Sequence, residues 1–145
     1  MKASTTLYRS KDAMQRKTTI DETLEVLRGK VGGSASCLGI KIAVGTVLDP
    51  MRQVDALMER EGELRQEREW CDVDIDEARF ICRGSAQYVG EIAAKILEQH
   101  YCDNMTLREI ADGLGCKVNV VRRIVEEGPF ILDSYDYTDM RLRGA

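Results

Sequence analysis

Proline, histidine and aromatic residues are scarce in this chain of 145 residues. Only Pro50 and Pro129 can interrupt its helices, because proline lacks the backbone N–H that a helix interior needs. The one histidine, His100, and five scattered cysteines form no C-x-x-C or Cys–His pattern typical of zinc sites or nucleophilic catalysis. We therefore expect no metal, no cofactor and no enzymatic activity.

Long apolar runs are missing as well. No stretch approaches the roughly 20 residues of a membrane span, and the first residues lack the apolar core of a signal peptide. An odd number of unpaired cysteines is typical of reduced thiols in the cytoplasm. A net charge of −4 disfavours indiscriminate coating of nucleic acid, although a local DNA-reading surface is compatible with it. We expect a cytoplasmic protein with no membrane segment.

The apolar residues that are present recur at helical spacing, which predicts an all-α fold. A first helix is predicted from about Thr19 to Lys30, and a long one from about Pro50 to Arg83 with Asp49 as its cap. The long helix carries a seam in steps of three and four residues: Val54, Leu57, Glu61, Leu64, Arg68, Cys71, Ile75, Ala78 and Cys82. Residues 1–84 are thus predicted to form a long-helix hairpin or coiled-coil-like body.

Two parts of this body have open interpretations. Residues 29–49 form a glycine-rich loop in which residues 38–44 alternate like a strand, so this part is either a short strand or an apolar loop. Residues 1–31 hold seven basic residues against four acidic ones. They could contact phosphates, although a solvated helix end is the more ordinary interpretation.

Residues 85–128 carry the most specific pattern in the chain. A helix from about Ala86 to Cys102, capped by Ser85, precedes two short helices joined by a turn. The first of these begins with a Thr106/Glu109 capping box. Ala111 allows close helix crossing, Gly115 makes the turn, Val121 locks the second helix, and Gly128-Pro129 ends it. Together these residues predict a helix-turn-helix domain, which a tail of residues 129–145 follows.

The exposed face of the second short helix is the candidate DNA-reading surface. In a helix-turn-helix this helix enters the major groove, where asparagine pairs with adenine, arginine with guanine, and lysine with phosphate. The candidate residues are Lys117, Val118, Asn119, Val120, Arg122 and Arg123. The alternative is a helical hairpin whose basic residues are simply solvated.

The stretch LEQHYCDNMTLREIADGLGCKVNVVRRI resembles the C-terminal unit of sigma-factor region four. The whole layout is similar to small phage and prophage proteins of the sigma-region-four-like type, including RinA- and ArpU-like late transcription regulators. The resemblance implies a short helix, a variable loop, a long charged helix and a terminal helix-turn-helix. It also implies that Lys117, Val118, Asn119, Val120, Arg122 and Arg123 face DNA. Lys117 departs from the family pattern, which commonly has Ser or Thr there.

Two classes of function follow. The first is a phage-type transcription regulator that binds double-stranded DNA, alone or beside host RNA polymerase, and that can form a homo-oligomer. The second is a protein-binding module, such as an inhibitor of host RNA polymerase or of a defence complex, in which the helix-turn-helix is reused for protein contacts. Residues 106–128 hold four basic and four acidic residues, a low positive charge for a DNA-binding unit.

Overall fold

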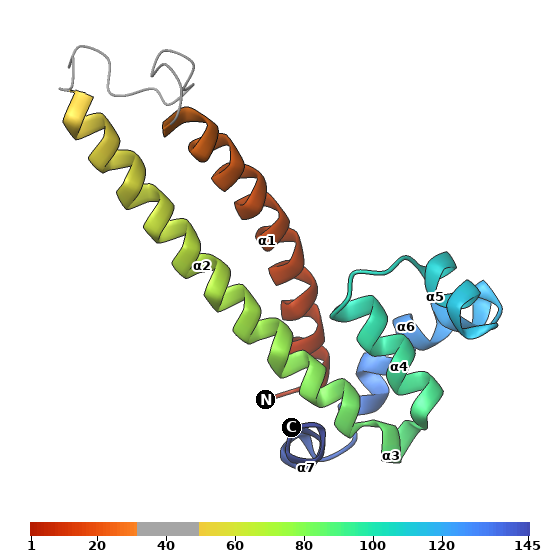
Figure 1. Ribbon diagram of the computed structural model, residues 1–145. Coiled ribbons are helices and arrows are strands. Elements are labelled where there is room, and N and C mark those ends of the chain that lie inside the picture. Colours follow the sequence, from red (N-terminus) through yellow and green to blue (C-terminus); the bar gives the residue numbers. More distant parts are fainter. Residues whose placement is uncertain (32–49) are drawn as a thin grey trace. The chain divides into compact units, whose positions relative to one another are not determined.

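A computed structural model describes residues 1–31 and 50–145, and all their secondary structure is helical, as predicted (Figure 1). The helices are α1 (Ala3–Val31), α2 (Pro50–Gly84), α3 (Ala86–Val89), α4 (Glu91–Tyr101), α5 (Leu107–Leu114), α6 (Val118–Leu132) and α7 (Tyr137–Gly144). The predicted cap Asp49 and the strand-like residues 38–44 lie outside the described residues. Within the described ranges, no helix is long and apolar enough to cross a membrane.

The described chain packs as two compact units. One unit comprises Met1–Gln15 with Cys71–Ala145, and the other comprises Arg16–Trp70. Both long helices contribute to both units. The predicted domain limits at residues 84 and 128 stay predictions, since a unit of packing need not fold independently.

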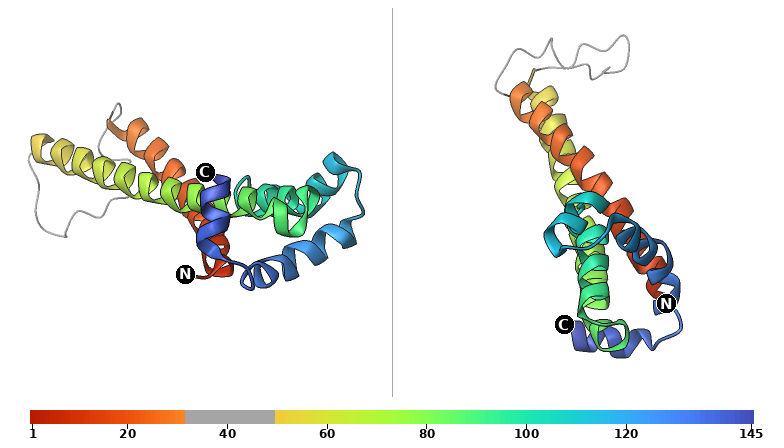
Figure 2. Two further views of the ribbon diagram at one scale, coloured as in Figure 1. Left: turned by 90° about the horizontal axis from the view of Figure 1, so that it is seen from below. Right: turned by 90° about the vertical axis from the view of Figure 1, so that its right-hand side faces the viewer.

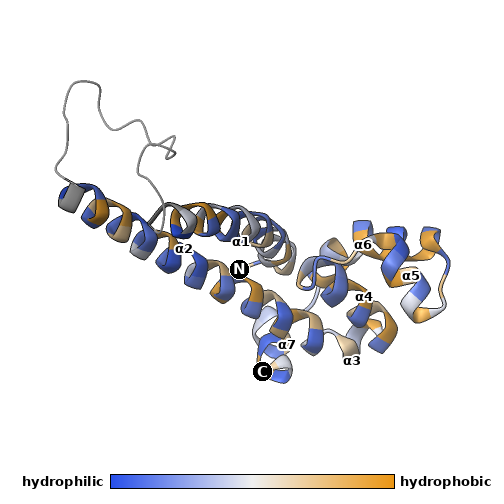
Figure 3. Ribbon diagram, turned by 45° about the horizontal axis from the view of Figure 1, so that its top comes forward, coloured by the Kyte–Doolittle hydropathy of each residue, from blue (hydrophilic) through white to orange (hydrophobic). Residues whose placement is uncertain are grey.

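The Arg16–Trp70 unit pairs the second half of α1 with the first part of α2. Its buried side chains are Ile20, Leu24, Leu27, Leu57 and Leu64. The predicted seam of α2 therefore holds at Leu57 and Leu64. Val54 is 41% exposed. The ribbon of α2 in Figure 3 is largely hydrophilic with separated hydrophobic turns, as expected for a helix that buries a narrow stripe.

Ion pairs border this apolar contact. Arg68 reaches Asp21 at 2.8 Å, and Arg28 lies 3.8 Å from Glu61. The two polar residues of the predicted seam, Glu61 and Arg68, thus hold partners on α1. Helix α2 also runs without a break through Gly62, where a side chain would meet open space.

Helix α1 begins at Ala3, whereas the apolar pattern predicted a start near Thr19. The apolar stripe left the residues before Thr19 open, as either helical or loose, and the structure shows them helical, with Ser4 and Ser10 buried beside Leu7 and Met14. Ser4 and Ser10 are buried around Leu7, and Ser10 donates a hydrogen bond to the Tyr101 carbonyl at 2.7 Å. Each of these hydroxyls depends on a partner far away in the sequence.

The predicted helix from Ala86 to Cys102 is divided in two. Gly90 has φ of +94°, and this left-handed residue separates α3 from α4. Ser85 does not cap α3, because it is already helical and its hydroxyl donates to the Cys82 carbonyl at 2.7 Å. The prediction of a Ser85 cap was wrong.

Helix α6 continues through Gly128 and Pro129 to Leu132, although these residues were predicted to end it. Pro129 cannot donate to the Val125 carbonyl as a helical N–H would. The Tyr101 hydroxyl replaces that donor, at 2.8 Å from the Val125 oxygen. Gly128 permits close packing on α4, since a Cβ there would lie 2.9 Å from a Leu97 methyl carbon.

The last turn of α6 lies beside the first turns of α1, as both views of Figure 2 show. The rings of Tyr8 and Phe130 are 6.2 Å apart. Asp133, which follows α6, accepts hydrogen bonds from the Ser4 amide at 2.8 Å and the Ser4 hydroxyl at 2.6 Å. These contacts fix the end of α6 to the start of the chain.

Helix α7 packs on α2 with almost no space between backbones. A Cβ on Gly84 would lie 1.6 Å from the Met140 carbonyl oxygen, and one on Gly144 would lie 1.8 Å from the Phe80 oxygen. Arg141 pairs with Glu77 at 2.7 Å. Residues 137–144 of the predicted tail therefore fold back onto α2.

Candidate nucleic-acid interface

The turn between α5 and α6 has the local geometry that its residues predict. The Thr106 side chain accepts a hydrogen bond from the Glu109 amide at 3.2 Å, so it caps α5. The Glu109 carboxylate accepts a hydrogen bond from the Thr106 hydroxyl at 3.1 Å, whereas in a full capping box it would accept one from the Thr106 backbone N–H. Gly115 has φ of +67° and ψ of 28°, the left-handed conformation that ends α5.

Buried small and branched residues hold the two helices together. Ile110 and Ala111 of α5 and Val121 of α6 are each almost completely buried. The Cys116 amide also donates to the Ala111 carbonyl at 3.0 Å, which closes the turn. The start of α6 is therefore fixed relative to α5.

All six candidate residues lie at this start of α6. Lys117 has extended backbone and is the N-cap, and its side chain makes no capping bond. Val118 is half-buried, and the other five candidates are exposed: Lys117, Asn119, Val120, Arg122 and Arg123. The structure thus brings the predicted residues together at one helix end, which carries partial positive charge.

Helical spacing divides the exposed candidates between two sides of α6. Val118 and Arg122 are four residues apart, as are Asn119 and Arg123, so these four share one face. Val120 instead begins a stripe with Ile124, Glu127 and Ile131, at steps of four, three and four. We call the first set the reading face, defined as Val118, Asn119, Arg122 and Arg123.

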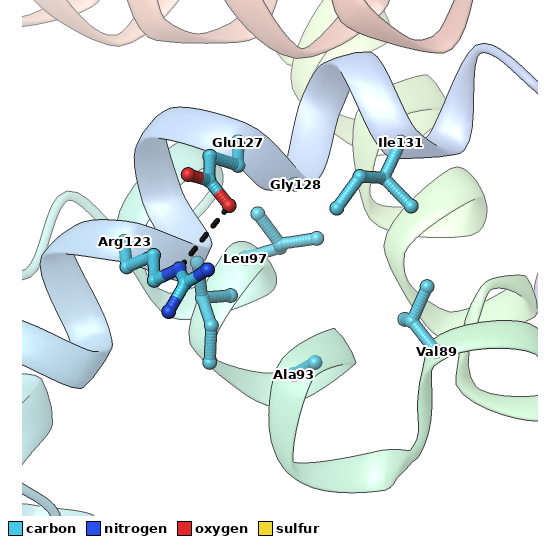
Figure 4. Close-up of a pocket in the computed structure, with 8 residues that line it drawn as sticks. Val89, Ala93, Leu97, Arg123, Glu127, Gly128 and Ile131 are labelled. Atoms are coloured by element: carbon cyan, nitrogen blue, oxygen red, sulfur yellow. Dashed lines mark hydrogen bonds and ion pairs between the residues drawn. The ribbon is translucent and has the colours of Figure 1, made fainter.

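The second stripe borders a hollow of about 320 Å³ between α6 and the α3–α4 segment. Its lining residues are Val89, Ala93, Leu97, Arg123, Ile124, Glu127, Gly128 and Ile131. Figure 4 shows Val89 and Ile131 on opposite sides of this space. The Arg123–Glu127 ion pair, at 3.3 Å, forms its polar edge. The hollow is mainly apolar and has no catalytic arrangement of side chains among its lining residues.

Several cations of α4, α5 and the start of α6 have no partner among the described residues. They form no hydrogen bond or ion pair: Lys95 of α4, Arg108 of α5, Lys117, and Arg122 of α6. Lys95 and Arg108 were not among the sequence candidates, because the motif indicates only the second helix. Both side chains are exposed and unpartnered, and that is the signal that adds them. Within residues 106–128 only Arg123 and Glu127 form an ion pair, so Arg108, Lys117 and Arg122 keep their charges exposed beside those of Glu109, Asp112 and Glu126.

The loop before α5 is held by contacts from α1. The Lys11 ammonium donates to the His100 carbonyl and to the Asn104 side-chain oxygen, both at 3.4 Å. Burial lowers the pKa of Lys11. Burial also lowers the pKa of His100, and the nearby Lys11 charge lowers it further. This loop is thus a supporting element that fixes where α5 begins.

Comparison with protein-family models, with curated proteins and with solved structures finds no match to this chain. The part of the chain that the structure describes also contains no group of three or more His, Cys, Asp or Glu side chains that could hold a metal ion.

Proposed function

We propose that this protein is a phage-type, sequence-specific DNA-binding transcription regulator that resembles sigma region four and acts in the cytoplasm. In this proposal α4, α5 and α6 form a helix-turn-helix unit, and α1 with α2 forms its hairpin-like body. The N-terminal half of α6 lies in a major groove of double-stranded DNA. The resemblance of residues 97–124 to sigma region four supports the same assignment.

One observation carries the proposal: Lys117 and Arg122, which have no partner among the described residues, flank the exposed Asn119 at the start of a helix that follows a left-handed glycine turn. Lys117 and Arg122 are suited to phosphates. The first N–H groups of α6, which no side chain caps, are suited to the same anions. Asn119 and Arg123 share the reading face and are suited to base edges. Arg123 must exchange Glu127 for a guanine to take this role.

The test begins with selection of DNA sites by purified protein at near-physiological salt. Fluorescence anisotropy then compares wild type, Lys117→Ala and Arg123→Ala over several salt concentrations. Loss of a base contact should cost about 1–3 kcal/mol on the selected site and relax the preference at one position. Loss of a phosphate contact should weaken binding to all sequences alike and reduce the salt slope by about one.

Arg60→Ala is the matched control for Arg123→Ala. Arg60 is an exposed arginine paired with Glu63 on the same helix, as Arg123 is with Glu127. The control should bind as wild type does. If wild-type protein binds no duplex even at low salt, where electrostatic attraction is strongest, the proposed function is wrong.

The hollow between α6 and the α3–α4 segment favours a second candidate function. Ile131 on its border is 47% exposed, and Ile92 on α4 is 64% exposed. Such apolar surface is suited to a protein partner, such as host RNA polymerase or another host complex. Capture of RNA polymerase by wild type but not by Ile131→Asp, without DNA binding, would favour this candidate. Sedimentation of the free protein would establish whether it forms a homo-oligomer.

A further inference from the structure

The first turn of α6 presents two side chains of different chemistry to the same space. Asn119 is exposed, and its amide has no hydrogen-bond partner among the described residues. Val118, half-buried, precedes it and offers only methyl groups. Resting on the proposed function, we infer that this turn selects A·T base pairs: Val118 contacts a thymine methyl group, and Asn119 pairs with adenine.

The chemistry of the major groove favours this assignment for Val118. A valine cannot form hydrogen bonds to base edges, so it can distinguish bases there only through an apolar contact. The C5-methyl group of thymine is the apolar feature of the major-groove edge, and side-chain methyl groups are known to contact it. Val118 also lies four residues before Arg122, on the reading face.

The neighbouring valines are less suited to this role. Val121 is completely buried against α5. Val120 is 47% exposed, but its stripe continues into Ile124 and Ile131, which line the hollow beside α4. Val118 is thus the valine of this turn that both shares the reading face and retains accessible surface.

Asn119 supplies the complementary contact. An asparagine amide can accept from adenine N6 and donate to adenine N7 at the same time. The flanking cations Lys117 and Arg122 have no internal partner, so they can neutralise phosphates on either side. Since residues 106–128 have equal numbers of basic and acidic residues, specific binding depends strongly on such base contacts.

Deoxyuridine tests the thymine contact, because it lacks only the C5-methyl group. Each thymine of the selected site is replaced in turn, and binding of wild-type protein is measured by anisotropy. At one position the affinity should fall about fourfold, the effect of removing one buried methyl group. Val118→Ala should bind the thymine site more weakly and lose its sensitivity to deoxyuridine at that position.

Val73→Ala is the matched control, since Val73 lies on α2 and is 65% exposed. It should retain both wild-type affinity and the deoxyuridine effect. Asn119→Ala should lose the preference for adenine at one position. Thermal unfolding establishes that each variant is folded. If Val118→Ala does not fold, the deoxyuridine series on wild-type protein still decides the thymine contact.

Three results would overturn the inference while leaving the proposed function intact. Wild type could bind its site with no deoxyuridine effect at any thymine, Val118→Ala could retain the effect, or the selected site could lack A·T pairs. An absence of binding to every duplex would instead refute the proposed function, and this inference with it.

Discussion

Most arginines of α2 and both arginines of α7 differ from the unpartnered cations of α4, α5 and α6 in one respect: they pair with carboxylates. The paired arginines on these two helices are Arg60, Arg65, Arg68, Arg79, Arg83, Arg141 and Arg143. Lys95, Arg108, Lys117 and Arg122 hold none. An exposed ion pair stabilises a fold by only about 0–1 kcal/mol, so pairing alters stability little. It does neutralise the positive charge, and an unpaired cation keeps its full attraction for a polyanion.

Net charge alone does not distinguish a surface whose arginines are paired with carboxylates from a surface whose cations are unpaired. The chain carries −4 overall, yet three cations without a partner among the described residues, Arg108, Lys117 and Arg122, lie within the short segment 106–122. The same residue type thus supports structure in one region and is available for binding in the other. Single substitutions can therefore disturb each region separately.

The largest effect is expected where α7 meets α2. Gly84→Ala places a Cβ 1.6 Å from the Met140 carbonyl oxygen, so α7 must move. We expect a loss of about 3 kcal/mol in the free energy of unfolding, at the upper end of overpacking effects. Urea unfolding measures it. Gly62→Ala, where nothing lies within 4 Å, should instead stabilise α2 by up to about 1 kcal/mol. Equal stability of the two variants would contradict the described contact.

A smaller loss is expected at the turn. Gly115→Val should destabilise the protein by about 1–2 kcal/mol, because φ of +67° is strained for a branched side chain. Gly113→Val is the control, since Gly113 lies in α5 with open space around it and should change stability by less than about 0.5 kcal/mol. Thermal unfolding of both variants gives the difference. An unchanged midpoint for Gly115→Val would show that the turn tolerates a side chain.

The next change converts a paired cation into an unpaired one. Glu127→Gln removes the carboxylate that holds Arg123 at 3.3 Å, so Arg123 becomes free to bind DNA. We expect DNA affinity to rise about two- to fivefold at low salt, the equivalent of one exposed ion pair. Glu63→Gln breaks the Arg60 pair and changes the net charge equally. If both variants bind more tightly to the same extent, the effect comes from net charge rather than from Arg123.

The smallest effect concerns His100, which lies in the last turn of α4 and whose carbonyl accepts from Lys11. Its pKa is lowered in the folded protein by burial and then by the Lys11 charge, so protonation favours unfolding. The stability that neutral His100 contributes is complete above the ordinary pKa of 6.5 and decreases as the pH falls below it. Unfolding measured between pH 5 and pH 8 should show a shallower decrease for His100→Gln than for wild type. Identical pH profiles would refute the assignment.

Local sequence signals predicted much of the fold. The extent of α2, the cap at Thr106 and the turn at Gly115 each depend on neighbouring residues and were correctly predicted. The first half of α1 was not predictable in this way. Its buried Ser4 and Ser10 form hydrogen bonds with Asp133 and Tyr101, so their burial depends on partners more than 90 residues away in the sequence.

The second half of α6 illustrates the same limit. A Gly-Pro pair ordinarily ends a helix, and only the Tyr101 hydroxyl makes the longer helix acceptable. For the candidate site, the sequence predicted which residues gather at the start of α6. It could not predict that Ile124 and Ile131 line a hollow with Val89 and Leu97, because that depends on how α6 packs against the α3–α4 segment.

Asp133 also has a consequence for the order in which this protein can mature. The Ser4 amide is one of the first N–H groups of α1, which lack partners within the helix, and Asp133 supplies the acceptor. During synthesis the first helix therefore leaves the ribosome long before its acceptor exists. Closing a contact across 129 residues is slow compared with local helix formation. The first turn of α1 thus reaches its final state only after Asp133 has left the ribosome.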